Sequence, residues 1–313
     1  MQEFILLICG LAGLWLGSEI LIRGAIALAD RYNVADAVIG MFILAIGTDL
    51  PELFIAFDAS FRSLTGEDLS GIIIGSAVGS GIGQLGLVMG VAGFIGFGPR
   101  PLKLALRNAV FLLGALILLA IFSIDGLISR GAGWVLIATY AAYLGSLVLW
   151  PSANNEPKAE VTTSPIYKDI FFLVAGLCLL LFAAELTVVS ATDFAALVGL
   201  SNLAVSAVII GLGSSLPELS VSLIALLKNR GGLSIGNLMG SNVLDTILVP
   251  GVGAVISPLV IPASVLWLDL PVLALITLLV LGFLYVSPRG VQKIEACILL
   301  VIYICYAVVR GLS

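Results

Sequence analysis

The chain has 313 residues, of which 60% are hydrophobic and 11% are charged, with a formal net charge of −5 and a mean hydropathy of +1.21. Soluble domains carry about 25% charged residues, so this composition excludes a soluble protein, and the lack of a basic patch excludes a nucleic-acid partner. The sequence contains no His, which excludes histidine-dependent catalysis and removes the usual nitrogen ligand of zinc.

Long apolar segments predict an all-helical integral membrane protein. A helix needs about 20 apolar residues to cross a bilayer. Ten segments meet this length, at residues 3–29, 36–61, 71–97, 102–123, 130–150, 168–195, 202–227, 233–257, 263–286 and 291–310. The polar stretch between the fifth and sixth divides the chain into a five-helix repeat at 1–150, a linker at 151–167 and a second five-helix repeat at 168–313.

The basic residues predict the orientation of the spans. With Arg23 set aside because it lies inside the first span, one side of the membrane holds ten Lys and Arg residues and the other holds three, namely Arg62, Arg130 and Arg310. Cytoplasmic loops are enriched in Lys and Arg. We therefore expect a multi-pass plasma-membrane protein with a cytoplasmic linker and both termini outside.

The two halves repeat each other in sequence. A shift of 166 residues aligns Gly47 with Gly213 and Leu50–Leu53 with Leu216–Leu219, and a shift of 161 aligns residues 75–91 with 236–252. Because five is an odd number, two such units joined by one loop enter the membrane from opposite sides. This pattern predicts the inverted repeat that many secondary transporters share.

Polar motifs interrupt apolar segments at matched positions in the two halves. "GTDLPE" ends at Glu52 and "GSSLPE" ends at Glu218. Pro removes a backbone donor and breaks the helix, and the carbonyl groups freed in this way need partners inside a membrane. Thr48 and Ser214 each precede the Glu by four residues, so hydroxyl and carboxylate share one helix face.

A second pair of polar positions follows in each half. Ser80 and Gln84 lie four residues apart, and so do their counterparts Ser241 and Asp245. The inverted symmetry predicts that all four segments meet near the membrane midplane. A pocket of oxygen ligands without His or Cys suits a hard cation such as Ca²⁺ or Na⁺. Acids inside a bilayer are costly, and a bound cation would supply the missing counter-charge.

These motifs resemble the two alpha repeats of the calcium/cation antiporter superfamily, and most closely its sodium/calcium exchanger branch with the prokaryotic members. The resemblance implies exchange of Ca²⁺ against Na⁺ by alternating access. It implies that Glu52 and Glu218 are the main Ca²⁺ ligands. The other implied ion ligands are Thr48, Ser214, Ser215, Ser80, Ser241, Gln84, Asp245 and the main-chain oxygens of Ala45 and Gly211.

The sequence departs from the family pattern at three positions. Gly81 stands in place of the Asn that the second half has as Asn242. The other two are Asp49, where the family usually has Ser, and Gln84, where it usually has Asn. Asp49 adds an acid that either joins the site or points away from it. Both changes bear on the choice of counter-ion, so H⁺/Ca²⁺ exchange at the same site stays open beside Na⁺/Ca²⁺ exchange.

Two other classes are weighed against a transporter. A cation channel is disfavoured because one chain supplies both halves of the site, which also predicts a functional monomer. An enzyme is disfavoured because Ser-His and buried Ser-Lys pairs are unavailable. Among other charges within spans, Glu19 and Glu185 are each either an acid of the ion entry path or a structural contact, and the spacing allows Glu19 to pair with Arg23. Asp58 is a vestibule residue at best.

Overall fold

The computed structural model describes residues 2–96, 102–149, 165–197, 213, 215–286 and 291–312. These residues are helical almost throughout. The first half contains α1 (Gln2–Tyr32), α2 (Asp36–Ile39), η1 (Gly40–Leu44), α3 (Ala45–Thr48), α4 (Leu50–Ser63), α5 (Ser70–Ile82), η2 (Gly83–Val88), α6 (Met89–Ile95), α7 (Leu102–Ser123) and α8 (Arg130–Leu149), where η marks π-helix. The second half contains α9 (Ile166–Leu197), α12 (Leu216–Leu227), α13 (Gly231–Val243), η4 (Leu244–Leu248), α14 (Val249–Ile256), η5 (Val265–Asp269), α15 (Leu270–Val286) and α16 (Lys293–Leu312).

The described residues confirm most of the expected spans. Seven helices are long and apolar enough to cross a membrane, and the bent pair Asp36–Thr48 and Leu50–Ser63 makes an eighth. The expected span at 202–227 lies partly outside the described residues and is seen at Gly213 and from Ser215 onward. The expected last span corresponds to α16. The count of ten spans therefore stays a prediction.

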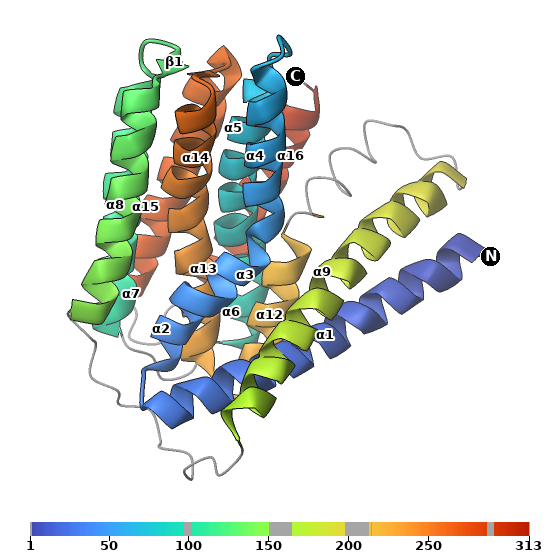
Figure 1. Cartoon of the computed structure of the whole chain (residues 1–313). Coiled ribbons are helices and arrows are strands. Elements are labelled where there is room, and N and C mark those ends of the chain that lie inside the picture. Colours follow the sequence, from blue (N-terminus) through green and yellow to red (C-terminus); the bar gives the residue numbers. More distant parts are fainter. Residues whose placement is uncertain are drawn as a thin grey trace.

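Two helices lie side by side and antiparallel along one flank of the upright bundle (Figure 1). These are α1 and α9, the first helices of the two halves, and glycine lets their backbones approach. Gly10 on α1 lies against Thr187, and Gly176 on α9 lies against Leu21. Since the shift of 166 relates Gly10 to Gly176 and Leu21 to Thr187, the two contacts are exchanged by the repeat. Such small-residue packing is the usual way in which membrane helices associate.

The centre of the bundle is formed by the matched second blocks of the two halves. In the most apolar 18 residues of Ser70–Ile95 and of Gly231–Ile256, 72% and 78% of the residues are buried, whereas in the other long apolar helices the share is at most 39%. Every residue of α13 is buried. Most polar residues of the two central spans therefore lie inside the protein.

A short ladder departs from the all-helical expectation. The strands β1 (Leu127–Ile128) and β2 (Leu259–Val260) pair antiparallel. Nearby, an Nη2 hydrogen of Arg130 is donated to the carbonyl of Ile256 at 3.1 Å. The turn after α7 is thereby tied to the segment after α14.

The four cysteines lie in apolar segments, a pattern that predicts buried positions, and this prediction is wrong. All four are free and exposed, namely Cys9, Cys178, Cys297 and Cys305. In a membrane protein the residues that face lipid are as apolar as those that face the protein core. Sequence alone therefore does not tell a lipid-facing cysteine from a buried one.

Candidate ion-binding site

The first half breaks its second span next to the expected acid. Helix α3 ends at Thr48, α4 begins at Leu50, and the two parts are bent by 45°. Asp49 between them has φ −87° and ψ 7°, and Pro51 occupies the first turn of α4. Glu52 follows in the same turn and is 2% exposed. The helix break predicted from Pro51 is confirmed, and it places Glu52 at the N-terminus of a helix, where its negative charge is favoured.

The second half has the same local geometry. Helix α12 begins at Leu216 after Ser215, which has φ −98° and ψ 4° and is the repeat counterpart of Asp49. Pro217 lies in the first turn, and Glu218 next to it is fully buried. The two acids therefore occupy equivalent places at two helix starts.

The glycines before the breaks provide room for α9. A Cβ on Gly47 would lie 3.2 Å from Leu177, and a Cβ on Gly213 would contact Val188. Both neighbours belong to α9. These glycines therefore permit close packing of the breaks against α9.

The second polar pair lies in matched π-helical segments. Gln84 is in η2 and Asp245 is in η4, and the shift of 161 superimposes the starts of both segments, Gly83 and Leu244. A π-helical turn inside an α-helix is often found at functional sites. The sequence carried no signal for these turns beyond the repeat itself.

The side-chain amide of Gln84 joins residues from both halves. Its Nε2 donates to Oδ2 of Asp245 at 3.1 Å, to Oγ of Ser80 at 3.1 Å and, at 3.5 Å, to Oδ1 of Asp49. Gln84 and Asp245 are counterparts under the repeat, so this contact lies on the axis that relates the halves. The Asp49 side chain thus points into the site and not into a neighbouring helix.

Asn242 fixes the orientation of that amide and was not among the expected site residues. Its Nδ2 donates to the carbonyl of Leu238 at 2.9 Å and to Oε1 of Gln84 at 2.7 Å. Because the Leu238 carbonyl can only accept, Asn242 must present its NH₂ group there, and Gln84 must present its oxygen to Asn242. The Gln84 NH₂ group is consequently directed at the acids. In the sequence, the one indication that Asn242 belongs to the site is its position directly after Ser241.

Several buried oxygens at the site have no hydrogen-bond donor among the described residues. They are both carboxylate oxygens of Glu218, Oε2 of Glu52, Oδ2 of Asp49, Oδ1 of Asp245 and the hydroxyl oxygens of Ser215 and Ser241. Buried polar atoms are nearly always paired in proteins. A concentration of unpaired acceptors is the arrangement that a cation would satisfy.

The acids lie near one another without forming a ready-made cage. Asp49 and Glu218 come within reach of each other, but neither can donate a hydrogen bond while both are ionised. Glu52 is in electrostatic range of Asp245 and Glu218. Within the described ranges, no three acids are close enough to enclose a metal ion by themselves. Hydroxyl, amide and main-chain oxygens would have to complete the coordination.

The other expected ligands fall into two groups. The carbonyl of Ala45 accepts from the Asp49 backbone at 3.0 Å and from Oγ1 of Thr48 at 3.4 Å, and that hydroxyl also donates to Leu44 at 3.1 Å. These oxygens face the break but are already engaged within their own helix. Gly211 and Ser214 lie outside the described residues.

The acids expected at the margins take no part in the site. Glu19 forms an ion pair with Lys228, so the expected pair with Arg23 is wrong. Asp58 is 74% exposed and lies 3.8 Å from Arg62. Glu185 is exposed on α9. Lys228 is 209 positions from Glu19 in the sequence, so a local spacing rule could not predict this partner.

Sequence comparison assigns the family. The family described as sodium/calcium exchanger protein matches residues 3–149 and 168–312, which is nearly the whole chain. The chain belongs to the sodium/calcium exchanger family. It is therefore a multi-pass membrane protein from a family of cation/Ca²⁺ antiporters, and this family carries calcium and sodium and is not a family of enzymes.

Individual relatives support this assignment. A putative antiporter, CaxA of Alkalimonas amylolytica, is 30% identical, with 96% of each chain covered. The sodium/calcium exchanger MaX1 of Methanosarcina acetivorans is 25% identical, with 98% of each chain covered. A solved structure of the sodium-calcium exchanger NCX_Mj, soaked with Na⁺ and Ca²⁺, is 31% identical, covers 97% of both chains and has a TM-score of 0.81.

Proposed function

We propose that this chain is a plasma-membrane antiporter that exchanges Ca²⁺ for Na⁺ by alternating access. Na⁺ moving inward would drive Ca²⁺ outward. The observation that carries this proposal is the pair of buried acids, Glu52 and Glu218, at equivalent helix breaks, with three of their four carboxylate oxygens lacking a donor among the described residues.

Ca²⁺ would bind between the two helix starts. Ca²⁺ takes six to eight oxygen ligands in flexible geometry, and Glu52 and Glu218 would supply the charged ones. Thr48 and Ser214 would contribute hydroxyl or main-chain oxygens, with the carbonyls of Ala45 and Gly211 completing the set once the breaks move.

Na⁺ would bind at the flanking positions. Ser80, Ser241, Ser215 and Asp245 offer the oxygens, and Oγ of Ser241 and Ser215 has no donor within the described part of the chain. Ca²⁺ and Na⁺ would share the central carboxylates, so one excludes the other. Because empty acids are costly inside a bilayer, the protein would change its facing direction only when they are neutralised.

We infer ten spans arranged as an inverted 5+5 repeat, acting as a monomer. Two features support this. The repeat that relates the two halves converts the contact of Gly10 with Thr187 into the contact of Gly176 with Leu21. It also converts Gln84 into Asp245, and these two residues contact each other. A single chain supplies both acids, so no second copy is needed to complete the site.

A transport assay tests the proposal. Purified protein is reconstituted into vesicles loaded with Na⁺ and diluted into Na⁺-free medium with labelled Ca²⁺, while a protonophore with strong buffer holds the pH equal on both sides. We expect Ca²⁺ uptake that depends on the Na⁺ gradient and saturates with Ca²⁺. Vesicles loaded with choline serve as the control. Equal uptake in both preparations would contradict Na⁺ coupling, and uptake that fails to saturate would indicate a channel.

H⁺/Ca²⁺ exchange is the second candidate because one observation favours it. Asp49 replaces a hydroxyl residue of the family pattern, and its carboxyl group is within reach of Glu218. Two carboxyl groups so close together can share a proton. Uptake in choline-loaded vesicles that is driven by a pH difference alone would support this alternative.

A further inference from the structure

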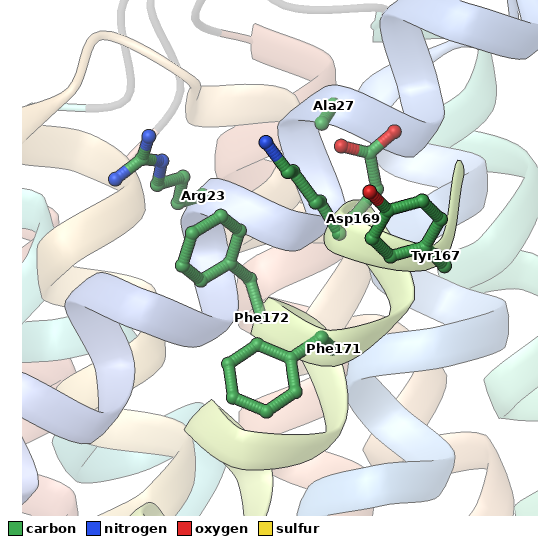
Figure 2. A pocket seen from close by; sticks show the side chains of 7 residues that line it. Arg23, Ala27, Tyr167, Asp169, Phe171 and Phe172 are labelled. Atoms are coloured by element: carbon green, nitrogen blue, oxygen red, sulfur yellow. The ribbon is translucent and has the colours of Figure 1, made fainter. Parts of the chain in front are cut away.

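A cavity of about 750 Å³ lies between α1 and α9, away from the buried acids. It is lined by Arg23 and Ala27 of α1 and by Tyr167, Lys168, Asp169, Phe171 and Phe172 at the start of α9 (Figure 2). Its walls thus combine two basic side chains with three aromatic rings. None of these residues takes part in the ion-binding site.

The cavity carries a net positive charge. The carboxylate of Asp169 is buried and accepts from Nη2 of Arg31 at 2.6 Å and from its Nε at 3.0 Å. Arg23 and Lys168 are both exposed, and neither forms an ion pair with a described residue. The acid nearest to Arg23 on its own helix face, Glu19, is held by Lys228. Two positive charges therefore remain for a partner outside the protein.

The position of Arg23 makes an aqueous partner a poor match. Its guanidinium lies 4.4 Å from the centre of the Phe172 ring (Figure 2), six residues into α9. Six helical residues rise by about 9 Å, so Arg23 lies well inside the end of α9. It also belongs to the span expected at residues 3–29, where we expect lipid to surround it. A basic side chain at this depth extends toward the headgroup layer.

The aromatic residues give the cavity the character of a membrane interface. Tyr167 is 66% exposed and Phe171 is 65% exposed. Tyr is enriched at headgroup level, where its ring meets acyl chains and its hydroxyl meets water. Phe171 and Phe172 provide an apolar surface directly next to the two cations. A molecule with an anionic head and an apolar chain matches both parts.

We propose that this cavity is a binding site for one anionic phospholipid. The phosphate would lie between Arg23 and Lys168, Tyr167 would donate a hydrogen bond to the headgroup, and an acyl chain would lie along Phe171 and Phe172. Because the lining residues come from two helices that are distant in sequence, the lipid would join the end of α1 to the start of α9.

Native mass spectrometry in a neutral detergent tests this site without any transport measurement. The full chain is titrated with phosphatidylglycerol and, separately, with phosphatidylcholine of the same acyl chains. A basic residue near an anionic headgroup contributes enough to change binding by about fivefold, so Arg23→Gln with Lys168→Gln should weaken phosphatidylglycerol binding by about 30-fold. Phosphatidylcholine binding should be weak in the wild type and unchanged in the variant.

Three controls make the result decisive. Lys293→Gln removes an exposed basic residue outside the cavity and should leave phosphatidylglycerol binding unchanged. Lys168→Gln alone should weaken phosphatidylglycerol binding by about fivefold. The double variant Arg23→Lys with Lys168→Arg keeps both positive charges and should bind phosphatidylglycerol as the wild type does. Excess inorganic phosphate should not displace the lipid.

The proposal is overturned by any of four outcomes. They are equal binding of the two lipids, unchanged phosphatidylglycerol binding in the double variant, an equal loss with Lys293→Gln, or displacement by inorganic phosphate. The last would indicate a simple anion site that does not use the aromatic surface.

Discussion

Glu218 combines full burial with two carboxylate oxygens that have no donor within the described residues. An unpaired buried charge costs several kcal/mol, so the site favours any ligand that brings positive charge. At the residue scale, the unpaired buried charge has two effects. It raises the free energy of the empty site, and it favours binding of a cation. If the proposed site is correct, the acids destabilise the unoccupied protein and a bound cation would offset that cost.

Replacing Glu218 with Gln should therefore separate stability from binding. Glu218→Gln removes the charge, and we expect Ca²⁺-dependent exchange to fall by about 100-fold or more, because a charged ligand in a buried site contributes about 3 kcal/mol or more. The thermal stability of the ion-free protein should stay the same or rise. Vesicle flux and a melting curve in detergent measure the two quantities.

The matched control is Glu67→Gln, which alters an exposed acid that pairs with Arg62 at 2.7 Å. Its exchange activity should equal that of the wild type. Normal exchange by Glu218→Gln would mean that the carboxylate is not a ligand.

The pair of Asn242 and Gln84 should act as one unit. Their hydrogen bond of 2.7 Å aligns the amide that reaches Asp245. In a double-mutant cycle with Asn242→Ala and Gln84→Ala, we expect a coupling energy of about 1–2 kcal/mol in the free energy of unfolding. A cycle of Gln84→Ala with Asn108→Ala should be additive, because Asn108 donates to the sulfur of Met41 instead. Additivity in both cycles would reject the proposed unit.

The sequence could predict the site only in part at this scale. Pro51 and Pro217 predicted the breaks beside Glu52 and Glu218, because that rule is local to a helix. The i, i+4 rule for Thr48 and Glu52 assumes one continuous helix, and the break at Asp49 lies between the two residues. The hydrogen bonds of Gln84 could not be predicted in this way. They depend on how η2 and η4 meet, and that contact joins residues 158 and 161 positions apart.

At the scale of elements, the contact between α1 and α9 depends on glycine. A Cβ at residue 176 would collide with the backbone of Leu21, whereas a Cβ at Gly145 on α8 would meet nothing within 4 Å. We expect Gly176→Ala to lower the melting temperature and Gly145→Ala to leave it unchanged or raise it, since Ala is the better helix former by about 1 kcal/mol. Thermal unfolding of both variants in one detergent tests this. Equal melting temperatures would show that the helices separate without cost.

Arg230 holds three elements together at one end of the bundle. It lies between α12 and α13, and its guanidinium contacts Asp30 of α1 at 3.1 Å and Asp36 of α2 at 3.1 Å. Asp36 is only 2% exposed, so the substitution removes a cation from beside a buried carboxylate. We expect Arg230→Met to lower the free energy of unfolding by about 3 kcal/mol.

Two variants control for this effect. Arg62 is 56% exposed and pairs with Asp58 and Glu67. Arg62→Met should lower the free energy of unfolding by less than about 1 kcal/mol. Arg230→Lys should retain part of the stability. A loss of stability with Arg62→Met equal to that with Arg230→Met would contradict the role of burial.

At the scale of the whole molecule, contacts between loops divide the ends of the helices into two groups. The turn at Leu127–Ile128 pairs with Leu259–Val260, and both follow spans expected to end outside. Arg31 pairs with Asp169, and Arg230 pairs with Asp30, and all of these belong to the side expected to be cytoplasmic. The grouping agrees with the distribution of basic residues. Which group faces the cytoplasm is a property of the bilayer and its insertion, so it stays a prediction.

Labelling of single cysteines tests both the orientation and the number of spans. After the four native cysteines are replaced with Ala, Thr65→Cys and Lys158→Cys place one thiol in the loop after α4 and one in the linker. Three expected spans separate the two positions, so an odd crossing number puts them on opposite sides of the membrane. We expect an impermeant maleimide to label Thr65→Cys in intact cells and Lys158→Cys only after the membrane is opened. The reverse pattern would overturn the orientation, and labelling of both from one side would overturn the ten-span arrangement, because it requires an even number of crossings between them.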